Sequence, residues 1–218
     1  MRSAILFLAL IIAFPASTSI AQSAYESQAE PGKERLGVRI GYSRTPNNIS
    51  DSFGAGLDLS LHFMQKIREP FSVDVTLGAI YLGSTESDIT TDFFGTSFDN
   101  VSMRILRMTL APMVEIPIDD RMNFYLSVGG GLYAVSLLLD QSFQQFDLTD
   151  NHLGVNVNAG VLRRLSTNWF VDLNVHLHKF WTADTLNPDN PDWTHVYSRG
   201  DSDPLFWGIT AGVALNLF

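Results

Sequence analysis

The segment LFWGITAGVALNLF (residues 205–218) alternates apolar side chains with small or polar ones. Successive side chains of a β-strand point to opposite faces of a sheet, so this alternation predicts a strand with one apolar and one polar face. A membrane-spanning sheet must close into a barrel, because lipid offers no partner for the hydrogen-bonding groups of a free edge. The apolar face of this segment carries Leu205, Trp207, Ile209, Ala211, Val213, Leu215 and Leu217.

The same two-residue period predicts seven further strands. Each is at or above the length of about 9 to 11 residues that a tilted transmembrane strand requires. In the segment 101–116 the apolar set changes parity partway, which a β-bulge or a later entry into the membrane would explain. The eight predicted strands span residues 36–44, 53–64, 71–83, 101–116, 123–138, 153–165, 169–181 and 205–218.

The connections between the predicted strands alternate in length. Those at 65–70, 117–122 and 166–168 are tight, those at 84–100, 139–152 and 182–204 are long, and the connection at 45–52 is intermediate. An even-stranded barrel has both ends of its chain on one side. Short turns typically face the periplasm and long loops the exterior. The sequence thus predicts an all-β, eight-stranded antiparallel up-and-down transmembrane β-barrel.

The amino-terminal residues have the features of a secretory signal. Met1 and Arg2 form a short basic lead, residues 4–14 are apolar, and Ser19 and Ala21 are small residues at the positions that a signal peptidase reads. We predict a cleaved signal peptide over residues 1–21, a short periplasmic segment over 22–35, a barrel domain over 36–218, and export through the Sec pathway. The chain has no Cys, so no disulfide can close the barrel.

The charge balance is acidic. The chain holds 14 Lys and Arg residues against 23 Asp and Glu residues, and loss of residues 1–21 with Arg2 leaves a net charge of about −10. This sign disfavours a nucleic-acid partner. No stretch after residue 21 is long and apolar enough for a transmembrane helix.

The two faces of the predicted strands differ in composition. One is rich in Val, Leu, Ile and Phe, and the other mixes charged residues with many glycines. Eight strands leave an interior only just wide enough for side chains, so small residues and paired charges suit the inside. We therefore assign the apolar face to lipid. A soluble, lipocalin-like barrel with the apolar face inside is the alternative. Aromatic residues expected in belts at the two membrane interfaces are Tyr42, Phe53, Phe63, Phe71, Tyr81, Phe124, Trp169 and Trp207.

Three stretches carry a resemblance to a known family: NFYLSVGGGLYAVS (123–136), LGVNVNAGVLRRLSTNWFVDLNVHLHKFW (153–181) and WGITAGVALNLF (207–218). The chain resembles the small eight-stranded outer-membrane barrels of Gram-negative bacteria, the OmpA, OmpX and OmpW type. The resemblance implies a location in the outer membrane, assembly by the barrel-insertion machinery, and contact with outer-membrane lipid and lipopolysaccharide. It also implies that the terminal aromatic residue Phe218 is part of the insertion signal.

Charged residues of both signs lie on the predicted inner face. A lone charge in the interior would be costly, whereas a paired one is tolerated. We interpret this set as a polar network that largely plugs the lumen, with a gated ion path as the alternative. We predict no cofactor and no metal site. The predicted lumenal residues are Arg39, Asp58, His62, Asp74, Arg107, Glu115, Arg164, Asp172 and His176.

Three further features suggest functions. His176 and His178 share the inner face. Some barrels that modify lipid A carry a His-x-Ser pair on a strand, but position 178 is His here and no acidic partner stands out in the sequence. The three long connections are acidic, with Arg199 as their only base, and Arg199-Gly200-Asp201 matches an adhesion tripeptide. We predict a monomer, because a closed barrel leaves no edge to pair, and a structural or surface-interaction role without enzymatic activity. The alternatives are a narrow porin-like channel for small or apolar solutes and a lipid A-modifying enzyme.

Overall fold

A computed structural model describes residues 34–45, 53–84, 100–141, 144–181 and 205–217. Several features predicted from the sequence lie outside these ranges. They are the signal peptide, residues 85–99 and 182–204 of the acidic connections, the Arg199-Gly200-Asp201 tripeptide within the latter, and Phe218. None of the described residues forms a helix long and apolar enough to cross a membrane.

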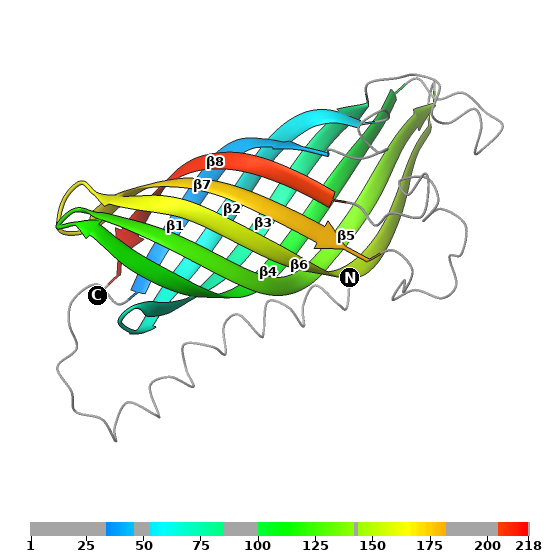
Figure 1. The fold of residues 1–218 in the computed structure, drawn as a ribbon. Helices are drawn as coiled ribbons and strands as arrows, with labels where there is room; N and C mark the ends of the chain where they lie inside the picture. Colours follow the sequence, from blue (N-terminus) through cyan, green and yellow to red (C-terminus); the bar gives the residue numbers. More distant parts are fainter. Residues whose placement is uncertain (1–33, 46–52, 85–99, 142–143, 182–204, 218) are drawn as a thin grey trace. The chain divides into compact units, whose positions relative to one another are not determined.

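The described residues form one antiparallel sheet that closes on itself in the order β1-β2-β3-β4-β5-β6-β7-β8 (Figure 1). Neighbours in sequence are neighbours in space, and β8 pairs with β1 to complete the barrel. This confirms the predicted fold class. The strands are β1 Glu34–Arg44, β2 Phe53–Arg68, β3 Phe71–Ser84, β4 Asn100–Asp119, β5 Met122–Gln141, β6 Gln144–Arg164, β7 Trp169–Phe180 and β8 Leu205–Asn216.

Following the hydrogen-bonded partners once around the barrel leads back to β1 about ten residues from the starting point, for example from Glu34 to Arg44. This offset is the stagger of the barrel. With ordinary strand spacing and rise, this stagger corresponds to a strand tilt of about 40° and a backbone radius of about 8 Å. Three tight turns, around Pro70, Asp120 and residues 165–168, gather at one end of the barrel, here called the turn end, and the opposite end is called the far end (Figure 1).

Two sequence expectations about the strands are corrected. The predicted loop at 139–152 is mostly strand, because the β5–β6 ladder continues to the pair Gln141 and Gln144. The parity change in β4 involves no bulge, since the β3–β4 register is continuous from Ser102 to Val114. Met103 and Ile105 instead point into the barrel, whose inner wall is apolar at that height.

Where side chains are described, exposure alternates along most of each strand as the face assignment predicts, and Ser136, which is buried between Val135 and Leu137 on β5, interrupts the alternation. On β7, Leu173 and Val175 are 55% and 51% exposed, whereas Asp172 and His176 are 0% and 2% exposed. A soluble barrel would show the reverse pattern. Phe53 is the exception among the predicted belt aromatics, because it is buried in the interior at the start of β2.

Candidate functional site

The barrel interior holds the candidate site, and Asp58 on β2 is its most densely bonded residue. Arg107 on β4 donates two hydrogen bonds to this carboxylate, at 2.8 and 2.9 Å, in the bidentate geometry that gives strong ion pairs. Ser43 donates a third at 2.8 Å, and His176 Nε2 lies 3.0 Å from the same oxygen. The four strands β1, β2, β4 and β7 are therefore joined at one buried carboxylate.

A second cluster surrounds Asp172 on β7. Arg39 Nε donates to this carboxylate at 2.6 Å, and the Tyr125 hydroxyl donates to its other oxygen at 2.9 Å. The same hydroxyl accepts hydrogen bonds from Arg39 at 3.2 Å and from Asn174 at 2.9 Å. Tyr125 thus links β1, β5 and β7 across the lumen.

His62 on β2 lies between two carboxylates. Its Nδ1 is 3.9 Å from Asp74 and its Nε2 is 3.8 Å from Asp172, and neither nitrogen has a hydrogen-bond partner. Asp74 accepts a hydrogen bond from Thr76 at 3.0 Å. Both side chains belong to the same buried layer as the two clusters above. We call the ionic layer the set Arg39, Ser43, Asp58, His62, Asp74, Arg107, Tyr125, Asp172, Asn174 and His176.

Glu115 on β4 lies nearer the turn end. It accepts hydrogen bonds from Arg35 at 2.9 Å, Ser72 at 2.7 Å and Asn123 at 3.3 Å. Arg35 was assigned to the periplasmic segment from sequence, but β1 begins at Glu34, so the Arg35 side chain enters the lumen. The guanidinium also lies 4.9 Å from the centre of the Phe170 ring, which gives it a cation–π contact.

Eight of the nine predicted lumenal residues are buried inside the barrel, and Arg164 is not. Arg164 is exposed at the last position of β6, and it donates to the carbonyl of Asp120 at 2.8 Å. It has the parity of an inward residue, but it lies at the rim of the turn end, beyond the layers that fill the lumen. This corrects the sequence prediction for Arg164.

Glycines on the inner wall make room for the large side chains of the ionic layer. A Cβ on Gly78 would come within 2.9 Å of the Arg107 guanidinium, and one on Gly208 would overlap both His176 and Ser43. These two positions need glycine because of close approach. The abundance of glycine on the polar face, noted in the sequence, therefore has a packing cause.

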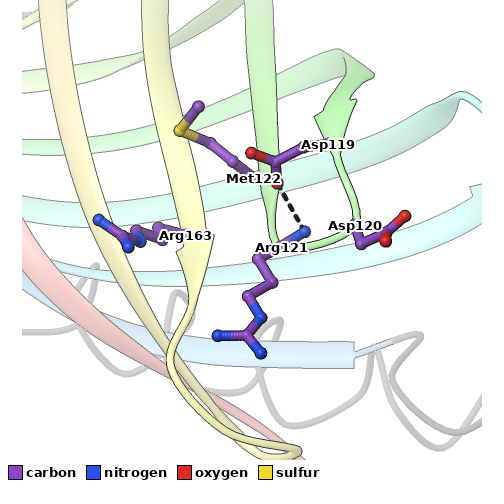
Figure 2. A pocket seen from close by; sticks show the side chains of 5 residues that line it. All are labelled: Asp119, Asp120, Arg121, Met122 and Arg163. Atoms are coloured by element: carbon purple, nitrogen blue, oxygen red, sulfur yellow. Dashed lines mark hydrogen bonds between the residues drawn. The ribbon is translucent and has the colours of Figure 1, made fainter.

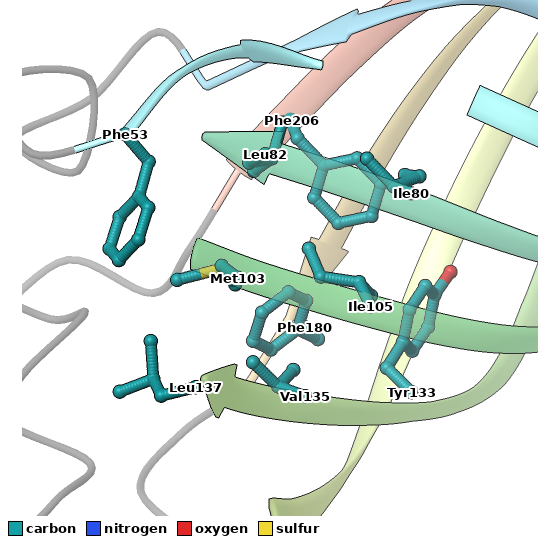
Figure 3. Close-up of a cluster of buried hydrophobic side chains, with 10 residues drawn as sticks. All are labelled: Phe53, Ile80, Leu82, Met103, Ile105, Tyr133, Val135, Leu137, Phe180 and Phe206. Carbon is teal, nitrogen blue, oxygen red and sulfur yellow. The ribbon is translucent and has the colours of Figure 1, made fainter. Parts of the chain in front are cut away.

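The far end of the lumen is apolar. Figure 3 shows ten side chains from β2, β3, β4, β5, β7 and β8 that converge there, each no more than 2% exposed. His178 connects this cluster to the ionic layer. It stacks on Phe206 and bonds to the Tyr133 hydroxyl at 2.8 Å, and its ring centre lies 5.1 Å from that of His176. We call this cluster the far-end apolar layer; it consists of Phe53, Ile80, Leu82, Met103, Ile105, Tyr133, Val135, Leu137, Phe180 and Phe206.

Little space remains between the layers. A central cavity near the ionic layer has a volume of about 10 Å³, which is room for about one water molecule. Among the described residues, no group of three or more His, Asp or Glu side chains is arranged to hold a metal ion. The cavity is lined by Arg39, Ser60, Thr76, Arg107, Thr109, Asn158, Asn174, His176, His178 and Thr210.

Ser43, His176 and Asn174 have the contacts of a possible hydrolytic group. The Ser43 hydroxyl lies 3.1 Å from His176 Nε2, and His176 Nδ1 lies 3.2 Å from the Asn174 side-chain oxygen. The Ser43 proton, however, is directed to Asp58. A histidine base would need to receive that proton, and a substrate would need access to the serine, yet Ser43 is fully buried. Sequence analysis found no acidic partner for His176; the structure supplies Asp58.

The exterior defines the class of protein. Apolar side chains such as Ile40, Leu110 and Leu173 are 49% to 57% exposed, and exposed residues of this kind occur on all eight strands, as on the lipid-facing surface of a membrane barrel. A closed sheet with this exterior and a polar inner wall is a transmembrane β-barrel of the outer-membrane class.

Comparison with known proteins agrees with this class at the level of fold. No family model matches the chain, and no curated protein matches it in sequence. Among solved structures, Neisserial surface protein A is similar with a TM-score of 0.56 and 9% identity over 86% of this chain and 99% of that chain. A major outer membrane protein from Thermus thermophilus gives a TM-score of 0.53 and 13% identity over 84% and 98%. The chain has the fold of the small eight-stranded outer-membrane barrels.

Proposed function

We propose that the protein is a non-conducting outer-membrane barrel with a structural or surface-interaction role. The observation that carries this proposal is that side chains fill the lumen at three heights: in the ionic layer, in the far-end apolar layer, and at the turn end, where Arg35 and Glu115 lie with a buried apolar cluster that includes Met64, Leu162 and Phe170. A backbone radius of about 8 Å leaves no room for an open path once side chains of this size are inside. The barrel then anchors the acidic connections between its strands in the membrane.

The displayed parts are the acidic connections. Residues 182–204 contain five Asp residues and the single base Arg199, and residues 84–100 contain four acidic residues. On the proposed orientation these segments face the medium, beside outer-membrane lipid and lipopolysaccharide, and the turn end faces the periplasm. We also propose that residues 1–21 are a cleaved signal peptide, and that the barrel-assembly machinery inserts the protein and reads Phe218 as part of the insertion signal.

Conductance in planar bilayers tests the plug. We expect wild-type protein to give no steady current. Phe180→Ala with Phe206→Ala opens the far-end apolar layer alone, and Arg39→Ala with Asp172→Ala opens the ionic layer alone; each double variant should remain silent, because the other layer still closes the lumen. Conduction should require all four substitutions together with Arg35→Ala and Phe170→Ala, because side chains at the turn end also close the lumen. Heat-modifiable migration in SDS gels verifies that each variant is folded.

A narrow porin-like channel is the alternative that the same recording addresses. A channel would give steady current in wild type, and opening either layer would raise that current by itself. A silent wild type together with a conducting sextuple variant, in which all three heights are opened, supports the plug. Steady current through folded wild-type protein contradicts it.

We also propose that the barrel is not an enzyme. The argument is the enclosure of Ser43 and His176 together with the direction of the Ser43 proton. Replacing His176 by Ala should therefore leave the lipid A mass spectrum of expressing cells unchanged. A change between cells that express wild type and cells that express folded H176A would contradict this part of the proposal.

A further inference from the structure

Three arginines meet at the turn end, outside the lumen. Arg121 lies in the β4–β5 turn, and Arg163 and Arg164 end β6. Two open hollows, of about 450 and 380 Å³, adjoin each other here and share Arg121. Figure 2 shows the first hollow, which Asp119, Asp120 and Met122 also line.

The arginine charges in this region are not neutralised locally. Asp119 accepts a hydrogen bond from the backbone nitrogen of Arg121 at 2.7 Å, and the Arg164 guanidinium bonds to the Asp120 backbone carbonyl. Within the described ranges, no carboxylate forms an ion pair with Arg121, Arg163 or Arg164. In Figure 2 the Arg121 and Arg163 guanidinium groups lie on one side of the turn and the Asp120 carboxylate on the other.

The arginines also lie at the edge of the lipid-facing band. Arg163 pairs with Met122 on β5. It follows the outward residues Val157, Ala159 and Val161 along β6. The nearby apolar residues Ile118 and Leu165 are 54% and 62% exposed. Arginine at such a boundary keeps its stem on apolar surface and its charge at the headgroup level.

We propose that this surface binds the phosphate of an anionic phospholipid in the leaflet that the turn end faces. A guanidinium donates two parallel hydrogen bonds to a phosphate. Arg121 in the β4–β5 turn and Arg163 at the end of β6 line one hollow, so they can hold a phosphate from two sides. The inference rests on the proposed orientation, in which the turn end faces the periplasm and therefore meets phospholipid and not lipopolysaccharide.

Native mass spectrometry of the full barrel in detergent tests the site, with phosphatidylglycerol and phosphatidylcholine as probes. Wild type should retain phosphatidylglycerol preferentially. Arg121→Gln with Arg163→Gln should reduce that preference by about tenfold, since each arginine near an anionic headgroup contributes to binding. The matched control is Arg68→Gln in the β2–β3 region of the same end, where Arg68 lies over the Phe71 ring at 5.6 Å; it should retain the preference.

Three outcomes overturn the inference: equal binding of both lipids by wild type, an unchanged preference in the folded double variant, or the same loss in Arg68→Gln. Stronger arginine-dependent binding of purified lipopolysaccharide than of phosphatidylglycerol also overturns it and reverses the orientation. None of these binding measurements depends on current through the lumen. They can therefore fail while the plug proposal holds, and the plug proposal can fail while they succeed.

Discussion

The ionic layer and the far-end apolar layer fill the same cylinder by different means. In the ionic layer, most of the ten side chains make directed polar contacts, as Asp58 does with Arg107, Ser43 and His176. In the apolar layer, ten side chains fill space mainly through apolar and ring contacts, and the Tyr133 hydroxyl bonds outside the layer to His178. The first arrangement depends on every partner being present, and the second depends only on volume.

This difference indicates which single substitutions should destabilise the barrel most. Removing one member of a buried ion pair leaves an unpaired charge, which is more costly than the pair itself is stabilising. Removing an apolar side chain leaves a cavity that neighbours can partly fill. The layers should therefore respond differently to single substitutions, and the predictions below test this contrast from the largest effect to the smallest.

Asp58→Ala should have the largest effect. It leaves Arg107 buried without its bidentate partner, and we expect a loss of about 3–5 kcal/mol in unfolding free energy. Urea titration of the refolded barrel, followed by heat-modifiable migration, measures it. Adding Arg107→Met should restore most of the loss, because the uncompensated charge is then gone. A double variant no more stable than the single would contradict the charge argument.

Leu137→Ala should cost less, about 2–3 kcal/mol, because the apolar layer can partly collapse at the far end. Leu126, which is 45% exposed to lipid, provides the matched control. Leu126→Ala leaves no interior cavity and should cost clearly less in the same titration. Equal losses at the two positions would show that the far-end layer is not packed as described.

Tyr125→Phe should cost about 1–2 kcal/mol, since it keeps the ring but removes the hydroxyl that serves Asp172, Arg39 and Asn174. The same urea titration measures it. The ion pair between Arg39 and Asp172 stays intact in this variant. A loss of unfolding free energy as large as that of Asp58→Ala would mean that the Tyr125 hydroxyl, and not the ion pair, stabilises the ionic layer.

The smallest effect is expected outside both layers, at Glu69 in the β2–β3 turn. The Lys66 ammonium donates to this carboxylate at 2.7 Å and holds the pKa of Glu69 below its ordinary value of 4.5. The stabilising contribution is therefore present above about pH 4.5 and is lost as the pH falls through the lowered pKa. Because Glu69 is fully exposed, Glu69→Gln should barely move the unfolding midpoint at neutral pH.

Much of the fold was predictable, because the two-residue period identifies strands and their two faces from local sequence alone. The period cannot give height along the barrel. Arg164 and Met103 both have inward parity, yet Arg164 lies at the rim and Met103 in the apolar layer. The sequence predicts a loop at 139–152 because this segment is polar, although the β5–β6 ladder extends through it to Gln141 and Gln144.

The partners within the site were less predictable than its members. Asp58 and Arg107 are 49 residues apart, and only the registers of β2, β3 and β4 bring them together. Ser43 and Tyr125 carried no sequence signal, since a single Ser or Tyr on an inner face has many uses. An alternating strand with unusually many glycines was the available clue that large side chains must fit opposite.

The β1–β8 seam has a consequence for biogenesis. It joins the first strand to the last, so the sheet gains its final ladder only when the most carboxy-terminal strand is available. A polypeptide interrupted before β8 would present two unsatisfied edges to lipid, a state that hydrocarbon cannot tolerate. Contacts of such long sequence separation also form slowly. Completion of synthesis and completion of the cylinder are thereby coupled, which gives the cell a point at which to discard unfinished molecules.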